Sequence, residues 1–180
     1  MFNRLSLEDF SKKIASAKAK LMVVREKRVR PGLDDKCLTS WNALLITALA
    51  EASAIFDDSH FYQMAVKAAD TIGTEMIDEQ GKLYRNNKNG HRSISGFLDD
   101  YSLYIESLIA LYQTDFKESW LASADALTKV VLENFKSAES PALYYTSKSD
   151  TALIARKYEV LDNVIASSNS VMAHNFQKLA

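Results

Sequence analysis

The chain has 180 residues, of which 47% are hydrophobic, 10% aromatic and 25% charged, with five glycines and two prolines. This composition excludes a collagen-like, low-complexity or natively unfolded chain, and a chain of this length can bury roughly 70% of the surface that its unfolded form exposes. Twenty-two basic and 23 acidic side chains give a net charge of -1, so overall charge provides no attraction to nucleic acid or an anionic membrane.

The first predicted element is a helix from Ser6 to about Val29. Ser6 followed three residues later by Asp9 is a helix-start signal, and a Pro-Gly pair follows the expected end. Residues 12–30 carry eight basic side chains and one acidic one, a local charge of +7. We interpret this run as a solvated helix, or one that contacts an acidic neighbour, in preference to a nucleic-acid surface.

Four further helices are predicted by apolar residues that recur every three or four positions. They occupy about residues 41–52, 61–76, 98–112 and 121–135. Short turns join them into two hairpins, and seven positions, from Leu49 with Leu108 onward, agree in class at an offset of 59 residues. The first of these helices carries an apolar side formed by Trp41, Leu44, Leu45, Ala48, Leu49 and Ala52. A sixth helix is expected beyond Asn169. The pattern indicates a helical-hairpin repeat.

Long links separate the hairpins, at residues 30–38, 78–96 and 136–167. Two of them contain a sequence pattern typical of β-strands, at 81–85 and 142–146, which predicts short β-hairpins in these loops. Helical hairpins of about sixty residues form either an open solenoid or a closed toroid. If successive hairpins are parallel, all three links emerge at one end, where we expect the functional residues. Six such hairpins need twice this length, so we expect residues 1–180 to be one domain truncated from a larger protein.

Other sites are not expected from the sequence. A single cysteine, Cys37, permits no disulfide within the chain and no cysteine-based zinc or redox pair. The three histidines lack metal-ligand spacing. We expect neither a signal peptide nor a membrane span, since the longest strongly apolar run is Ala43–Ala50. We therefore expect a cytoplasmic protein with no metal, no cofactor, and no nucleic-acid or membrane partner.

Three polar clusters lie where the long links meet the next helix, and each mixes carboxylates with an aromatic or amide side chain. Glycosidic cleavage needs one carboxylic acid and a second carboxylate, while aromatic rings stack on sugars and amides bind their hydroxyls. The predicted catalytic acids are Asp34 or Asp35 with Asp99 or Asp100. The predicted substrate-binding residues are Trp41, Asn42, Tyr101, Arg156, Glu159, Asp162 and Asn169. The alternative is that aspartates at helix starts serve as caps without any catalytic role.

The amino-acid sequence of these clusters is also similar to that of a known family. It reads Arg30-Pro31 with Asp34-Asp35-Lys36 and Leu38-Thr39-Ser40-Trp41-Asn42, then Phe97-Leu98-Asp99-Asp100-Tyr101, then Arg156, Glu159, Asp162 and Ser167-Ser168-Asn169-Ser170. In this order and spacing the chain resembles the thioredoxin-domain, spermatogenesis-associated protein family of the bacterial YyaL type. The resemblance implies part of an (α/α)6 toroid similar to six-hairpin glycosidases and N-acylglucosamine 2-epimerases, and a thioredoxin-like domain elsewhere in the whole protein.

Two functions follow from the residues and the resemblance together. The first is a glycoside hydrolase-like or other sugar-modifying site, with a carbohydrate ligand and the remainder of the same polypeptide as partners. Epimerase chemistry is less expected, because no histidine pair falls in the three clusters. The alternative is a non-catalytic ligand- or protein-binding scaffold coupled to a thioredoxin-like module, in which the carboxylates only lock the helix ends together.

Overall fold

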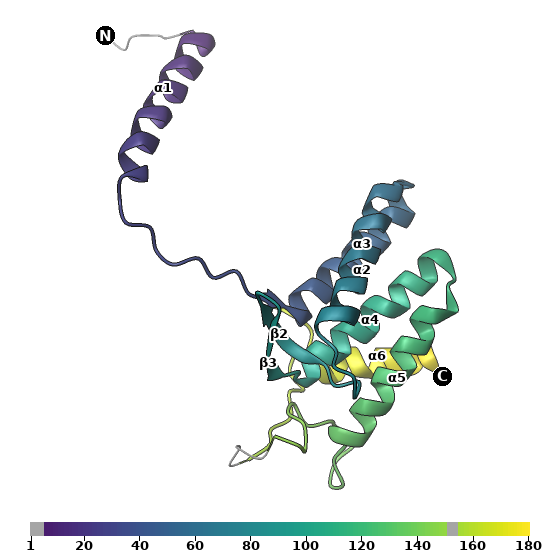
Figure 1. The fold of residues 1–180 in the computed structure, drawn as a ribbon. Coiled ribbons are helices and arrows are strands. Elements are labelled where there is room, and N and C mark those ends of the chain that lie inside the picture. Colours follow the sequence, from purple (N-terminus) through teal and green to yellow (C-terminus); the bar gives the residue numbers. More distant parts are fainter. Residues whose placement is uncertain (1–5, 151–154) are drawn as a thin grey trace. The chain divides into compact units, whose positions relative to one another are not determined.

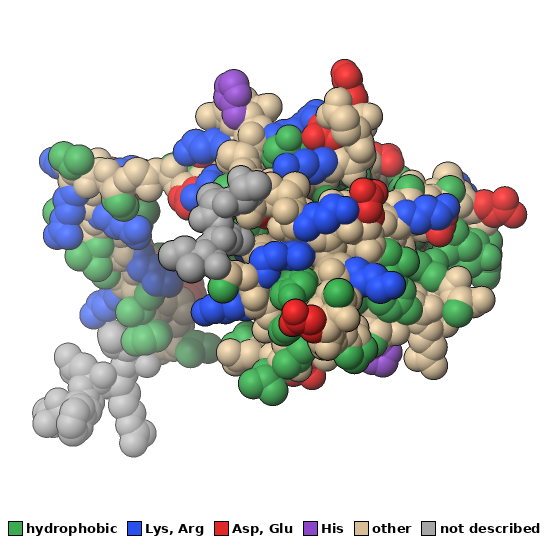
Figure 2. Space-filling model, turned by 90° about the horizontal axis from the view of Figure 1, so that it is seen from below, with side chains coloured by type: hydrophobic (Ala, Val, Ile, Leu, Met, Phe, Trp, Pro, Cys, Tyr) green, Lys and Arg blue, Asp and Glu red, His purple; other side chains and the backbone are tan. Residues whose placement is uncertain are grey.

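The structure, a computed structural model, describes residues 6–150 and 155–180 of the chain. It contains two compact units, Met1–Asp35 and Lys36–Ala180. In the first unit, α1 (Leu7–Glu26) starts where the Ser6 hydroxyl accepts a hydrogen bond of 3.1 Å from the Asp9 amide. This confirms the predicted start, whereas the helix ends about three residues earlier than expected. All residues of α1 are exposed, and basic and hydrophobic side chains share its surface, at the left of Figure 2.

The second unit is a helical-hairpin repeat with a small sheet (Figure 1). Its elements are β1 (Cys37–Leu38), α2 (Thr39–Phe56), α3 (Ser59–Glu75), β2 (Tyr84–Lys88), β3 (His91–Ser95), α4 (Leu98–Asp115), α5 (Glu118–Asn134) and α6 (Ser168–Leu179). An offset of 59 residues carries both bounds of α2 onto those of α4, and both bounds of α3 onto those of α5. Asp57 and Phe116, which end α2 and α4 in left-handed conformations, are also related by this offset. The predicted repeat is therefore confirmed.

The helices form two layers. We call α2, α4 and α6 the central row, because α4 packs between the other two, while α3 and α5 pack against α2 and α4. The middle helix, α4, buries 12 of its 18 residues, whereas α2 buries six of 18. The core between the layers is built from Ile46, Ile72, Ile105, Leu108 and Phe135, each no more than 1% exposed. The structure is thus mostly helical, as expected from the sequence.

The side of α2 that packs agrees with the predicted one only in part, because Leu44 and Leu49 pack against the core and other residues of that side do not. Trp41 and Leu45 are 65% and 50% exposed, and the buried side instead carries Ala43, Ile46 and Ala50. Both sides of α2 are apolar, so periodicity alone could not separate them. Small side chains on the buried side allow close approach of neighbouring helices, which a Trp-lined side would not.

The sheet is antiparallel, in the order β1-β2-β3. The strand expected at 81–85 starts later, because the Asp78 carboxylate accepts hydrogen bonds from the amides of Gln80 and Lys82 and folds this segment into a turn. The hairpin turn is Asn89-Gly90, both with positive φ. The strand-like stretch at 142–146 forms an isolated bridge between Tyr144 and Tyr158 in place of the expected hairpin.

The two long links that follow a hairpin each return to the first helix of that hairpin. The Tyr84 carbonyl, after α3, accepts a hydrogen bond of 2.6 Å from the hydroxyl of Thr39, the first residue of α2. The Tyr145 carbonyl, after α5, accepts one of 2.9 Å from the amide of Leu98, the first residue of α4. The links are therefore bound to the starts of the central helices.

The opposite end of the repeat is held by Asp115, at the end of α4. Its carboxylate accepts hydrogen bonds from the Tyr62 hydroxyl at 2.5 Å, the Lys117 amide at 2.9 Å and the Trp120 indole at 3.2 Å. Burial opposes the charge, but these hydrogen bonds lower the pKa of Asp115 to about 2. The sequence marked this residue only as part of a turn.

Within the described part of the chain, no helix combines the length and the apolar character needed to cross a bilayer.

Candidate functional site

The three central helices begin around one pocket of about 230 Å³. It is lined by Ser40, Trp41, Asp99, Leu103, Glu159, Asn163, Val164, Ile165 and Ala166. These residues come from the start of α2, the start of α4 and the link before α6. Residues from each of the three polar clusters therefore line one pocket at this end of the repeat.

Asp100 joins two of these helix starts from below the pocket. Its side chain is fully buried; Oδ1 accepts a hydrogen bond of 3.1 Å from the Ser40 amide, and Oδ2 accepts one of 3.0 Å from the Phe97 amide. Oδ2 also lies 3.0 Å from Nη1 of Arg85. Burial and the neighbouring Asp99 carboxylate raise the pKa of Asp100 to about 6. Because both oxygens are occupied and no solvent reaches them, we assign Asp100 a structural role in place of the catalytic role expected from the sequence.

Asp99, one residue earlier, faces the pocket. Its carboxylate oxygens lie 3.0 and 3.1 Å from Nη1 of Arg85, and its side chain is 22% exposed. The guanidinium of Arg85 also lies over the ring of Phe97, 4.9 Å from its centroid. Sequence reasoning missed Arg85, because nothing in the spacing shows that this residue of β2 returns to the start of α4.

Two further predicted residues share the pocket with Asp99. Trp41 presents an exposed indole from the first turn of α2. Glu159 is half-buried, and its Oε2 accepts a hydrogen bond of 3.1 Å from the amide of Ser168, at the start of α6. The pocket therefore combines two carboxylates and one aromatic surface, each from a different segment of the chain.

Two predicted binding residues instead hold the backbone together. The hydroxyl of Tyr101 accepts a hydrogen bond of 3.0 Å from the Leu83 amide, and burial raises the pKa of Tyr101 to about 12. The side-chain amide of Asn42 donates to the Leu38 carbonyl at 2.7 Å. These hydrogen bonds fix the links to the helices, and neither Tyr101 nor Asn42 lines the pocket.

The third cluster is similarly engaged. The Asn169 side chain exchanges two hydrogen bonds with the Leu143 backbone, accepting at 2.7 Å and donating at 2.9 Å. The Asp162 carboxylate accepts the Ser167 amide at 2.8 Å, and this hydrogen bond lowers the pKa of Asp162. Both residues shape the link that leads into α6.

Arg156 completes that link. Its guanidinium donates hydrogen bonds to the carbonyls of Thr146 and Asn134 and lies 4.0 Å from the centroid of the Tyr144 ring. The Tyr144 ring stacks in turn on Tyr158, with 4.5 Å between their centroids. Arg156 therefore acts as a clamp within the link.

Asp34 and Asp35 belong to the first compact unit, and both are exposed. The pocket is built entirely from residues of the second unit. Their predicted participation in catalysis stays a prediction.

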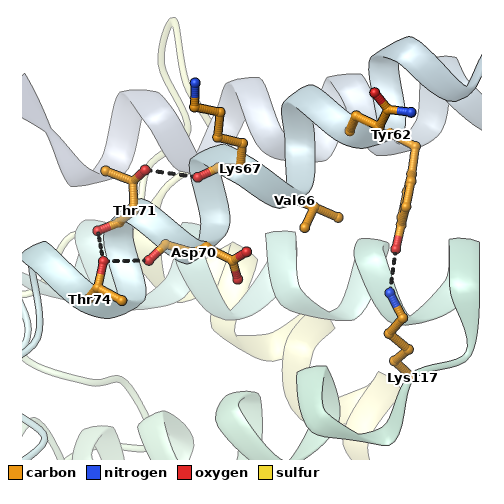
Figure 3. Close-up of a pocket in the computed structure, with 8 residues that line it drawn as sticks. Tyr62, Val66, Lys67, Asp70, Thr71, Thr74 and Lys117 are labelled. Carbon is orange, nitrogen blue, oxygen red and sulfur yellow. Dashed lines mark hydrogen bonds between the residues drawn. The ribbon is translucent and has the colours of Figure 1, made fainter.

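A larger hollow of about 420 Å³ lies along α3 (Figure 3). Its threonine hydroxyls are bound to the helix itself, since Thr71 and Thr74 donate to the carbonyls of Lys67 and Asp70 at 2.8 Å. Asp70 is the one acidic residue in its lining, so it offers no carboxylate pair. The pocket at the helix starts is therefore the better candidate for sugar chemistry. Across residues 6–150 and 155–180, no group of three or more His, Cys, Asp or Glu side chains is placed to hold a metal ion.

The fold is that of the six-hairpin glycosidase-like toroids. The cellobiose 2-epimerase from Bacillus thermoamylovorans matches with a TM-score of 0.64 at 15% identity, over 81% of this chain and 39% of the epimerase. A family 105 glycoside hydrolase from C. acetobutylicum matches with a TM-score of 0.63 at 12% identity, over 95% of this chain and 52% of the hydrolase. At these identities the likeness concerns the fold alone.

Relatives by sequence are more specific. The chain is 29% identical over 185 aligned positions to an uncharacterised protein of Caenorhabditis elegans, and 27% identical over 186 positions to spermatogenesis-associated protein 20 of Homo sapiens. These alignments cover 98% and 97% of the chain but 25% and 24% of the relatives. The chain thus spans about a quarter of their length. No protein-family model matches it.

Proposed function

We propose that the pocket at the starts of the central helices binds a carbohydrate, and that Asp99 and Glu159 act on its glycosidic or anomeric centre. The observation that carries the proposal is the shared pocket: two carboxylates and an exposed indole, from three segments, line about 230 Å³. Paired carboxyl groups supply the acid and the base or nucleophile of glycoside chemistry. The exposed Trp41 ring offers the flat apolar surface on which a pyranose stacks.

The surroundings of the two carboxylates suggest different roles. The Asp99 carboxylate lies 3.0 Å from Arg85, which holds it at the pocket, and we assign it the role of base or nucleophile. Oε2 of Glu159 accepts a hydrogen bond from the backbone amide of Ser168, which fixes the side chain at the pocket, and we assign Glu159 the complementary role of proton donor. In this proposal Asp100 and Arg85 are positioning residues that hold Asp99 at the pocket.

Tryptophan fluorescence provides the test. In a Trp120→Phe background Trp41 is the single tryptophan, since the chain has two. Titration with glucose, mannose and cellobiose is expected to change its emission saturably, and the intact chain is expected to release or convert sugar. Asp99→Asn should abolish turnover, while Asp125→Asn, an exposed carboxylate on α5, serves as the matched control. Unchanged emission and no turnover across these sugars would refute the proposal.

The second candidate is a non-catalytic scaffold coupled to a thioredoxin-like module of the longer protein. One observation favours it: several side chains of the three clusters form hydrogen bonds with backbone atoms. These side chains are Asp100, Tyr101, Arg156 and Asn169. In that case Asp99→Asn changes the melting temperature but no ligand-dependent signal. Saturable sugar binding that depends on Asp99 would rule it out.

A further inference from the structure

α1 carries a stripe of exposed apolar side chains along its whole length. The members of the stripe recur alternately three and four residues apart and are Leu7, Phe10, Ile14, Ala17, Leu21 and Val24. In a heptad written abcdefg, with Leu7 at a, they occupy all the a and d positions of the helix. All six are exposed, and the five larger side chains are 41–84% exposed. We call this surface the heptad stripe of α1.

Basic side chains line both edges of the heptad stripe. The e and g positions, which border a and d on either side, hold Ser11, Lys18, Arg25, Lys13, Lys20 and Lys27. Five of these six residues are basic and none is acidic. The acidic residues of the helix, Glu8, Asp9 and Glu26, lie at positions b, c and f, away from the stripe. The positive charge is therefore concentrated beside the apolar surface.

α1 lacks the contacts that normally stabilise a helix. None of its 20 residues is buried, whereas most helical stability in proteins comes from packing of an apolar face. The second half of the helix also borders a hollow of about 480 Å³, lined by Lys18, Leu21, Met22, Val24, Arg25 and Arg28. Apolar walls with a basic rim fit an apolar side chain that lies beside an acidic one.

We infer that α1 binds an acidic amphipathic helix of a partner protein through its heptad stripe. Residues at e and g face those of the neighbouring helix and set partner choice, so the basic edges select a partner with Glu or Asp at these positions. A second copy of α1 would place basic residues beside basic residues along both edges, which opposes self-pairing. Ala17 interrupts the bulky apolar surface that insertion into a lipid interface needs, but it lets a facing helix approach closely.

The second unit does not supply such a partner helix from its described residues. Among its described helices, α6 has no acidic residue and α2 has one, Glu51. The apolar sides of α3, α4 and α5 already pack in the core. The partner helix therefore comes from outside these helices, and its binding to α1 requires no sugar at the candidate pocket.

Fluorescence anisotropy of a labelled probe peptide, titrated with the 180-residue chain, tests this contact. The acidic probe has about three heptads with Leu at a and d and Glu at e and g, and the basic probe has Lys at e and g. The acidic probe is expected to bind saturably, and more weakly as the salt concentration rises. It should also increase the helical circular dichroism, because a partner stabilises α1. The basic probe should not bind.

Two charge reversals form a matched pair. Lys20→Glu changes a g position beside the heptad stripe, whereas Lys12→Glu changes an f position away from it, where Lys12 pairs with Glu8 at 2.6 Å. Lys20→Glu is expected to raise the dissociation constant of the acidic probe at least about fivefold. Lys12→Glu should raise it less than about twofold, since its charge is distant from the probe and screened by salt.

Two alanine substitutions separate binding from helix formation. Ile14→Ala truncates the heptad stripe and is expected to raise the dissociation constant at least about tenfold. Val23→Ala, at a residue 60% exposed on another side of α1, should leave it unchanged. Alanine favours the helix more than either original residue does, so weaker binding of Ile14→Ala would not reflect an unfolded helix.

Several results would overturn the inference. Equal binding of the acidic and basic probes, or no binding of either, would show that the edges do not select an acidic helix. Tighter binding to vesicles of phosphatidylserine and phosphatidylcholine would assign the heptad stripe to a membrane surface. Self-association of the chain that Ile14→Ala abolishes would assign it to a second copy. Failure of the acidic probe to bind a longer polypeptide that includes residues 1–180 would assign it to another part of that polypeptide.

Discussion

Replacing Asp100 by Asn tests whether this residue holds the starts of α2 and α4 together. The buried carboxylate accepts hydrogen bonds from the amides of Ser40 and Phe97 and pairs with Arg85. An Asn side chain has one acceptor oxygen and one donor group, so at least one buried N–H loses its partner, which costs about 1–3 kcal/mol. Loss of the charge weakens the contact with Arg85, although Asp99 keeps that guanidinium paired. We expect a total of about 2–4 kcal/mol.

For a domain of this size the loss corresponds to a melting temperature lower by roughly 5–15 °C. Thermal and urea unfolding followed by circular dichroism measure it. The matched control is Asp99→Asn, whose side chain is partly exposed and ties no helix start to another, and which should cost about 1 kcal/mol or less. Equal melting temperatures for wild type and Asp100→Asn would refute the assigned structural role.

Three further perturbations test other parts of the fold. Gly96→Ala would bring a methyl group to 2.9 Å from the Leu83 carbonyl oxygen, so the backbone must shift and the free energy of unfolding should fall by about 1–3 kcal/mol in urea. Tyr104→Phe removes the buried hydrogen bond to Ala69 and should cost about 1 kcal/mol by the same assay, with no change in secondary structure. Because the pKa of Asp115 is lowered to about 2, its stabilisation is complete above about pH 4 and is lost as the pH falls toward 2. Asp115→Asn should therefore remove about 1–2 kcal/mol of that acid dependence in unfolding curves measured between these pH values, and an unchanged acid profile would contradict the assignment.

Much of the fold could be predicted because one physical pattern repeats. The apolar spacing that defines α3 recurs 59 residues later in α5, and their bounds agree. The packing side of α2 could not be predicted, because both of its sides are apolar and only the neighbouring helices decide between them. The bridge between Tyr144 and Tyr158 was missed for a similar reason: alternating residues favour a strand only where a partner strand is available.

In the candidate site, too, the sequence predicts local features but not contacts between segments that are distant in the chain. Trp41, Asp99 and Glu159, one from each of the three polar clusters, line one pocket. The sequence could not show which of Asp99 and Asp100 lines the pocket. Neighbouring positions of a helix point about 100° apart, so the Asp99 carboxylate reaches the pocket and the Asp100 carboxylate is buried. Arg85 could not be predicted either, because its partners lie 14 and 15 residues away in sequence.

The hydrogen bonds from the first residues of α2 and α4 to the links that follow their hairpins have a consequence for cooperativity. Tyr84 binds the start of α2, and Tyr145 binds the start of α4, so a sequence repeat cut out at its helix ends would lack the residues that secure its own first turn. The cooperative unit of opening is therefore shifted along the chain from the sequence repeat: each unit comprises one hairpin together with the link that follows it. Amide hydrogen exchange should report one common opening energy for α2, α3 and β2, rather than separate values for helices and loop.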